Sequence, residues 1–114
     1  MSALLENYSQ YLKLGDAGGV AALFAEDGEF YDDAPTALGF PPISVKGRRK
    51  IEEFFRETFK RGGLQLANVA TNGNAMRYDV TVGKTVLLCL GVVTEGKGLI
   101  KRYRVVAVTP IPRH

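Results

Sequence analysis

A pair of adjacent carboxylates offers the clearest candidate chemistry in this sequence. The segment Glu29–Asp33 alternates like a short strand, and a period of two puts Phe30 and Asp32 on the same face. If Phe30 faces the core, Asp32 does too, and partial desolvation would raise the pKa of its carboxyl and suit it to general-base catalysis. A slip of one residue would exchange the faces and put Asp33 in this position. The structural alternative is that both aspartates only begin the turn toward Pro35.

Other reactive side-chain types are scarce. The one histidine, His114, is the last residue, so the sequence offers neither a metal-binding cluster nor a Ser-His-Asp arrangement. We therefore expect no metal and no cofactor. The single Cys89 lies in an apolar run and is expected to be a small buried hydrophobic residue rather than a nucleophile. A lone cysteine also fits a reducing cytoplasm.

Helices are expected to precede and follow the Asp32 segment. Apolar residues recur at helical spacing over residues 4–12, and Gly15 is a typical helix end. Asp16 can cap a second, short helix. Residues 34–42 contain three prolines and are expected to form a loop. A third helix is expected over residues 47–60, with one apolar stripe formed by Ile51, Phe54, Phe55 and Phe59.

Strand patterns dominate the second half of the chain. Asn72-Gly73 is a strong hairpin signal because both residues tolerate positive φ. Helices followed by an antiparallel meander predict an α+β fold with the helices on one face of the sheet. The chain is expected to be one domain, residues 1–114, since domains cluster near about 100–150 residues. The four expected strands are residues 64–70, 75–82, 85–93 and 99–109.

Alternation along these strands gives a candidate lining for a small-molecule pocket. Met76 and Tyr78 share one face of their strand, and Tyr103 lies opposite Arg102 and Arg104 on the last strand. An apolar, aromatic lining with few polar groups is typical of ligand sites, although the same residues could fill a closed core. The candidate ligand-binding residues are Tyr11, Phe30, Phe54, Phe55, Met76, Tyr78, Leu90 and Tyr103.

Composition narrows the choice of partners. Hydrophobic residues make up 46% of the chain and charged residues 24%, as in soluble globular proteins, and no apolar run approaches the length of a membrane span. The first residues lack the basic and apolar regions of a signal peptide, so we expect a cytoplasmic protein that does not enter a membrane. The basic cluster at residues 46–50 is typical of a solvated helix start, and no nucleic-acid partner is expected.

The run at residues 85–93 is apolar on both faces of its expected strand. One face can cover the helices. The other must be buried against something else, because a half-exposed strand would alternate between apolar and polar residues. We therefore expect a symmetric homodimer that packs through the sheet.

A spaced motif in the first third resembles the opening of the nuclear transport factor two-like superfamily. It comprises Tyr8, Gly15-Asp16 and residues 23–27, and the later segment Gly47 to Phe55 fits the same pattern. The branch it is most similar to contains the ketosteroid isomerases and the SnoaL-like polyketide cyclases. The resemblance spans nearly the whole chain. It implies a cone, in which a strongly curved and mainly antiparallel sheet wraps around three N-terminal helices and encloses a deep apolar pocket.

The resemblance also implies cofactor-free proton transfer next to a carbonyl on an apolar ring substrate. Asp32 matches the aspartate that shuttles the proton. Tyr8, seven residues before Gly15, matches the tyrosine that donates a hydrogen bond to the developing oxyanion, and the residues alone equally allow Tyr8 to be a core residue. These isomerases use a second, protonated acid, which would fall at about Leu90, where the sequence has none. The alternative function is a non-catalytic binding module for an apolar ligand or a partner.

Overall fold

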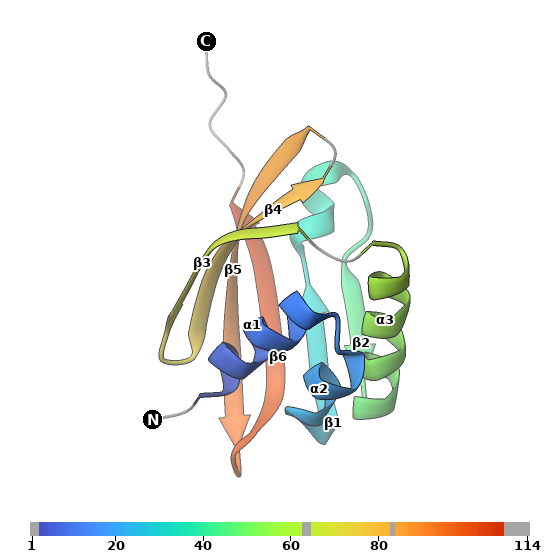
Figure 1. Ribbon diagram of the computed structural model, residues 1–114, viewed down its shortest axis with the longest axis vertical. Coiled ribbons are helices and arrows are strands. Elements are labelled where there is room, and N and C mark those ends of the chain that lie inside the picture. Colours follow the sequence, from blue (N-terminus) through green and yellow to red (C-terminus); the bar gives the residue numbers. More distant parts are fainter. Residues whose placement is uncertain (1–2, 63–64, 83, 109–114) are drawn as a thin grey trace.

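The computed structural model describes residues 3–62, 65–82 and 84–108 (Figure 1). Expectations that concern Leu64, Gly83, Thr109 or His114 lie outside the described residues. None of the described helices is long and apolar enough to cross a membrane. The elements in chain order are α1 (Leu4–Leu14), α2 (Ala17–Ala22), β1 (Phe24–Asp32), the 3-10 helix η1 (Ala34–Leu38), β2 (Ile43–Lys46), α3 (Arg48–Lys60), β3 (Gln65–Asn72), β4 (Ala75–Val82), β5 (Thr85–Gly96) and β6 (Leu99–Val108).

The three α-helices form where the sequence predicts them. Gly15 ends α1 in the left-handed conformation, with φ of 68°, which glycine adopts at little cost. The Asp16 carboxylate then caps α2 by accepting the Gly19 N–H at 2.9 Å. The expected stripe of α3 faces the core, where Ile51 and Phe55 are buried.

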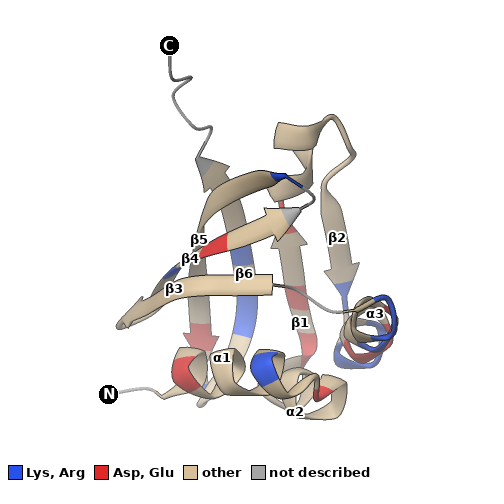
Figure 2. Cartoon of the chain, turned by 45° about the horizontal axis from the view of Figure 1, so that its top comes forward, with Lys and Arg blue, Asp and Glu red and all other residues tan. Residues whose placement is uncertain are grey.

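The six strands form one sheet in the order β2-β1-β6-β5-β4-β3. All neighbours pair antiparallel except β1 and β6, which are parallel. The sheet curves strongly, so that β3 and β4 cross the β5–β6 pair, and α1 and α2 lie on one side of it (Figures 1 and 2). The expected α+β fold, with three helices packed in a curved and mainly antiparallel sheet, is confirmed.

The region around Asp32 contains more strand than the sequence predicted. β1 begins at Phe24 rather than near Glu29, and its pairing with β6 is irregular between Phe24 and Glu29. A Cβ on Gly28 would lie 3.0 Å from two backbone carbonyl oxygens, so a side chain here would force the neighbouring backbone to shift. The expected loop over residues 34–42 contains η1. The short β2 that follows it was missed, because four residues are too few to show a pattern.

Alternation along β5 separates an inner from an outer face of the sheet. Leu87, Cys89 and Val93 are buried against the helices. The residues between them are apolar as well, and this confirms that the strand is apolar on both faces. The exposed apolar side chains on the outer face are Val86, Leu88, Leu90 and Val92 of β5 and Val106 of β6.

Candidate functional site

Asp32 ends β1 on the inner face of the sheet. Its neighbour on that face, Phe30, is only 4% exposed, and the Asp32 side chain is half-buried. The carboxylate accepts the Ala34 N–H at 2.8 Å, so it also helps to turn the chain into η1. Burial raises the pKa of the Asp32 carboxyl, and the negative charge of Asp33 adds to this, while the Ala34 N–H acts in the opposite direction.

Asp33 has a different role from Asp32. It follows the end of the strand, and its N–H donates to the Val105 carbonyl at 2.8 Å. Its own carbonyl accepts the Thr36 hydroxyl at 2.7 Å, so Asp33 begins η1. Both aspartates therefore take part in the turn, Asp32 through its carboxylate and Asp33 through its backbone, and Asp32 is the one on the inner face.

Three buried tyrosines lie within electrostatic reach of Asp32. Burial raises the pKa of Tyr8 well above its ordinary value, with smaller contributions from Tyr103, Tyr78 and the charge of Asp32. Burial is also the main cause of the raised pKa of Tyr78 and of Tyr103, and the Asp32 charge contributes to both. All three phenols therefore stay protonated at neutral pH and can act as hydrogen-bond donors.

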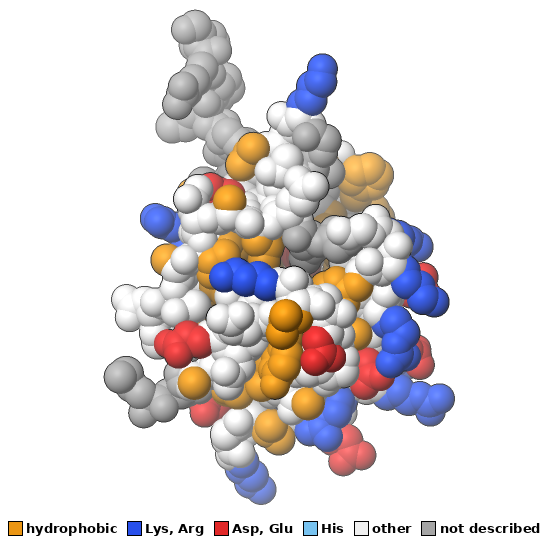
Figure 3. Space-filling view, viewed as in Figure 1, with side chains coloured by type: hydrophobic (Ala, Val, Ile, Leu, Met, Phe, Trp, Pro, Cys, Tyr) orange, Lys and Arg blue, Asp and Glu red, His pale blue; other side chains and the backbone are white. Residues whose placement is uncertain are grey.

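The interior of the cone is an aromatic cluster. The ring centroids of Tyr8 and Tyr103 are 4.8 Å apart, and Tyr8 meets Phe55 edge-on at 6.2 Å. Phe30 lies 5.2 Å from Phe55 and 5.9 Å from Tyr103. Each of these four side chains is at most 4% exposed, so in this conformation the rings themselves fill the space next to Asp32. Figure 3 shows hydrophobic side chains reaching the surface between α1 and β3.

The hydroxyl of Tyr103 is unusual in this cluster. Tyr103 is 0% exposed, and no described residue forms a hydrogen bond with its hydroxyl oxygen. A buried polar group without a partner costs about 1–3 kcal/mol, so such groups are rare in native proteins. The alternating pattern of the last strand predicted that Tyr103 lines the interior, but it carried no sign that the hydroxyl would lack a partner.

Leu90 does not line the interior, which corrects the expectation from the sequence. It is 40% exposed and lies on the outer face of β5, while its neighbours Cys89 and Gly91 face inward. Cys89 is buried as expected, and burial raises the pKa of its thiol to about 11. Its thiol donates to the Leu87 carbonyl at 4.0 Å, and it interacts electrostatically with Tyr78, its cross-strand partner on β4. The inward positions of β5 at residues 87, 89, 91 and 93 carry no carboxyl group.

The remaining predicted lining residues lie in two places. Met76 and Tyr78 are buried in the interior, as expected. Tyr11 lies further along α1, where its ring covers Gly19 of α2. Phe54 is half-buried and lines a groove of about 670 Å³ between β2 and α3. Its ring also lies 5.6 Å from that of Phe30, so Phe54 stands between this groove and the aromatic interior.

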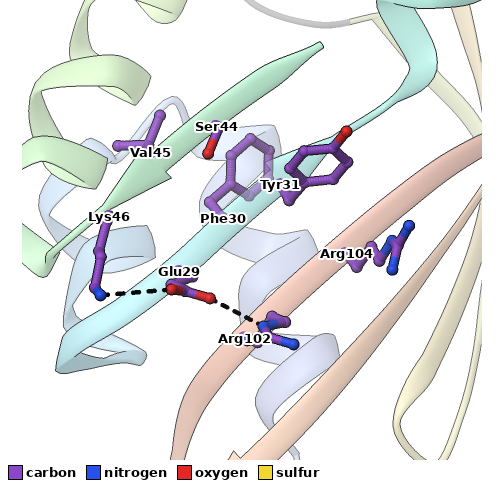
Figure 4. Close-up of a pocket in the computed structure, with 8 residues that line it drawn as sticks. All are labelled: Glu29, Phe30, Tyr31, Ser44, Val45, Lys46, Arg102 and Arg104. Atoms are coloured by element: carbon purple, nitrogen blue, oxygen red, sulfur yellow. Dashed lines mark hydrogen bonds and ion pairs between the residues drawn. The ribbon is translucent and has the colours of Figure 1, made fainter.

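A second pocket, of about 310 Å³, lies on the outer face of β1, β2 and β6 (Figure 4). Glu29 is at its centre, 3.0 Å from the Arg102 guanidinium and 3.7 Å from the Lys46 ammonium. The Arg104 guanidinium lies 5.5 Å from the centre of the Tyr31 ring. Figure 2 shows acidic positions of β1 beside basic positions of β6. Arg102 and Arg104 therefore point away from the interior, as the alternation predicts.

The site is built from carboxyl, phenol and aromatic groups. Among the described residues, no group of three or more histidine, cysteine, aspartate or glutamate side chains is arranged to hold a metal ion. The inner face of the sheet combines one half-buried carboxylate with protonated phenols in an apolar surround. This combination can move a proton and stabilise an oxyanion without a cofactor.

Comparisons with known proteins define the class of fold. No family model matches the chain, and no curated protein matches its sequence. A protein from Sphaerobacter thermophilus is similar in structure, with a TM-score of 0.73 and 21% identity over 92% of this chain and 93% of that one. A putative ketosteroid isomerase from Kribbella flavida has a TM-score of 0.67 and 19% identity over 98% of this chain and 80% of that one.

A third solved structure, from Catenulispora acidiphila, is described as having a ketosteroid isomerase-like fold and is in complex with trimethylamine. Its TM-score is 0.62, with 12% identity over 90% of this chain and 82% of that one. At these identities the likeness concerns the fold. The chain has the nuclear transport factor two-like, ketosteroid isomerase-like fold, as its N-terminal motif and its terminal meander predict.

Proposed function

We propose that this protein binds a small apolar ring compound carrying a carbonyl group and transfers a proton next to that carbonyl, without a cofactor. Asp32 is the proposed base and Tyr8 the proposed hydrogen-bond donor to the carbonyl oxygen. The observation that carries the proposal is the half-buried Asp32 carboxylate, which has a raised pKa and interacts electrostatically with buried, protonated phenols on the inner face of the sheet.

The two groups divide the chemistry between them. A base is most effective when its pKa lies closer to the working pH, and burial moves the pKa of Asp32 in that direction. Removing a proton next to a carbonyl leaves negative charge on the oxygen, and a buried phenol that is already oriented stabilises this charge as it forms. A ring substrate suits the apolar surround, since aromatic side chains offer it large contact areas.

Binding requires the interior to open. The aromatic rings fill the space next to Asp32, so a ligand must displace at least one of them. Phe54 is the best candidate to move, because one side of it faces a groove and the other faces the cluster. The similar structure in complex with trimethylamine supports the idea that a protein of this fold accommodates a small molecule.

The test of the proposal is isomerisation of a β,γ-unsaturated ketosteroid to the conjugated ketone, followed by the absorbance of the product. We expect Asp32→Asn to lower kcat by roughly 100-fold or more, which is the usual contribution of a general base. Asp33→Asn is the matched control, because it neutralises the adjacent carboxylate outside the inner face and should keep the activity of the unmodified chain. Equal rates for the unmodified chain and Asp32→Asn would eliminate the proposed base.

A non-catalytic binding module is the second candidate. The observation that favours it is the inner face of β5, which has no acid to complete the expected oxyanion hole. This function predicts saturable binding of an apolar ring ketone by the unmodified chain, with no turnover and with the same affinity in Asp32→Asn. Isothermal titration beside the absorbance assay separates the two functions.

We also propose that two copies of the chain pack through the outer face of β5. Four large apolar side chains on this strand and Val106 beside them are between 37% and 51% exposed. A contiguous apolar patch of this kind on a sheet is typical of a protein interface. An isologous dimer is the simplest symmetric solution, because the same strand on both copies then covers itself. The partner expected at this face is therefore a second copy of the chain.

A further inference from the structure

The strongest unexplained feature of the interior is the hydroxyl of Tyr103. Its side chain projects from β6 toward β5 among other buried rings, and no described residue forms a hydrogen bond with its oxygen. A phenol is a strong donor, and burying it without an acceptor is unfavourable. A phenylalanine at this position would fill the same space at no such cost. The hydroxyl therefore calls for an acceptor that the described residues do not supply.

Gly91 is the reason that the hydroxyl can occupy its position. A Cβ built on Gly91 would lie only 2.4 Å from the Tyr103 hydroxyl oxygen and 2.3 Å from a ring carbon. The phenol thus occupies the space in which a side chain from residue 91 would stand. The isomerase pattern places its second acid at about Leu90. Gly91 is one of the two inward-facing positions next to Leu90. A polar group is therefore present in this part of the interior, but it comes from β6 rather than β5.

We propose that Tyr103 is a second hydrogen-bond donor to the ligand oxygen, acting beside Tyr8 in the place that a protonated acid would otherwise fill. The ligand class is an apolar ring compound with a carbonyl or phenolate oxygen. The two tyrosine rings are neighbours, with centroids 4.8 Å apart, and the two phenols interact electrostatically, so both belong to the same part of the interior. This inference rests on the proposed ligand site and is independent of Asp32 acting as a base.

The same inference explains why the hydroxyl is left without a partner. A donor that already has an internal acceptor would have to break that bond before it could serve a ligand. A donor held in place by packing, with no competing acceptor, needs no reorganisation when the ligand oxygen arrives.

The experiment uses 2-naphthol as the probe, because its fluorescence distinguishes the naphthol from the naphtholate. For Tyr103→Phe we expect binding to weaken roughly 10- to 100-fold, with a smaller fraction of bound naphtholate, since the lost bond is to a charged acceptor. The melting temperature of the ligand-free variant should stay equal or rise, because the change removes an unpartnered hydroxyl. Tyr31→Phe, on the outer face, is the matched control and should bind like the unmodified chain.

Weaker ligand binding together with an equal or higher melting temperature would exclude a merely structural role for the Tyr103 hydroxyl. If Tyr103→Phe binds 2-naphthol as tightly as the unmodified chain, or if the unmodified chain binds none, the inference is wrong. A measurement on the unmodified chain keeps the test independent of how the variant folds: with tyrosines labelled at the ζ carbon, 2-naphthol should shift the Tyr103 resonance. An unshifted resonance at saturation would also overturn the inference.

The failure of this inference and the failure of the proposed base are distinguishable. Asp32→Asn should lose ketosteroid turnover and bind 2-naphthol at least as tightly as the unmodified chain, because it removes a negative charge that acts on the same phenols. If 2-naphthol binding depends on Tyr103 but the unmodified chain shows no ketosteroid turnover, Asp32 is not a base and Tyr103 remains the proposed donor. If turnover depends on Asp32 but 2-naphthol affinity is unchanged in Tyr103→Phe, Tyr103 is not a donor and Asp32 remains the proposed base.

Discussion

Gly91→Ala is the sharpest perturbation of the packing that holds Tyr103. The added methyl group would lie 2.3–2.7 Å from three atoms of the Tyr103 side chain, far inside contact distance. The ring has no room to retreat, because it is 0% exposed and lies against Tyr8 and Phe30. The variant must therefore shift either the phenol or the strand.

The size of the effect follows from two opposing contributions. Overpacking a tight core costs about 1–3 kcal/mol. Replacing a strand glycine by alanine returns about 0.5–1 kcal/mol, because the unfolded chain loses freedom. The net loss in free energy of unfolding should be about 1–2 kcal/mol. For a domain of this size that corresponds to a fall of roughly 4–10 °C in melting temperature.

Urea denaturation of four proteins measures this loss: the unmodified chain, Gly91→Ala, Tyr103→Leu and the double variant. In the double variant the shorter leucine relieves the clash, so the two changes should couple by at least about 1 kcal/mol. Gly18→Ala is the matched control. It adds the same methyl group in α2, where the nearest atom is an ordinary 3.7 Å away, and it should leave stability equal or raise it. Additive effects, or a Gly91→Ala variant as stable as the control, would refute the placement of the phenol over Gly91.

Four further predictions concern the base, the outer face and the start of α3. Because burial raises the pKa of Asp32 above its ordinary value of 3.8, turnover should fall as pH drops through the raised pKa, and a midpoint at the ordinary value would contradict this. The raised pKa also means that ionisation of Asp32 opposes folding, so Asp32→Asn should be more stable than the unmodified chain at pH 7, with a difference that vanishes below the ordinary pKa. Leu90→Lys should convert a dimer to a monomer in sedimentation at micromolar concentration. Leu14→Lys, at a 74% exposed position on α1, is the control and should leave the dimer intact. If the unmodified chain is itself a monomer, the proposed dimer is wrong. Arg48 donates from Nε and Nη2 to one backbone carbonyl of β1, at 2.9 and 2.7 Å. Arg48→Met should therefore lower the free energy of unfolding, measured by urea denaturation, by about 1–3 kcal/mol, and the exposed Arg49→Met should lower it by less than about 0.5 kcal/mol. Equal losses in the two variants would show that the carbonyl contact adds no stability.

Local patterns predicted the elements well because each has a local physical cause. Gly15 ends α1 because only a residue that accepts positive φ closes the helix there, and Asp16 caps α2 because its carboxylate reaches an orphan N–H. The period of two placed Phe30 and Asp32 on one face before any tertiary contact was known. The same period separated Tyr103 from its basic neighbours on β6.

Errors arose where the answer depends on pairing between distant segments. Leu90 is expected in the interior, but the pairing of β5 with its neighbours decides which face each residue takes and puts Leu90 on the outer face. The short β2 has too few residues to show a pattern, and it exists because β1 offers it an edge with Phe30 opposite Val45.

The amino-acid sequence by itself determined the order of the three α-helices and of the four strands that follow them, the shared face of Phe30 and Asp32, and the two apolar faces of β5, because period and capping act within a few residues. Tertiary structure alone decided that β1 lies parallel to β6 and that Tyr103 reaches over Gly91 with an unpartnered hydroxyl. These features join residues far apart in the chain through strand register and side-chain volume. No local pattern encodes them, so the proposed second donor became visible only when the sheet was assembled.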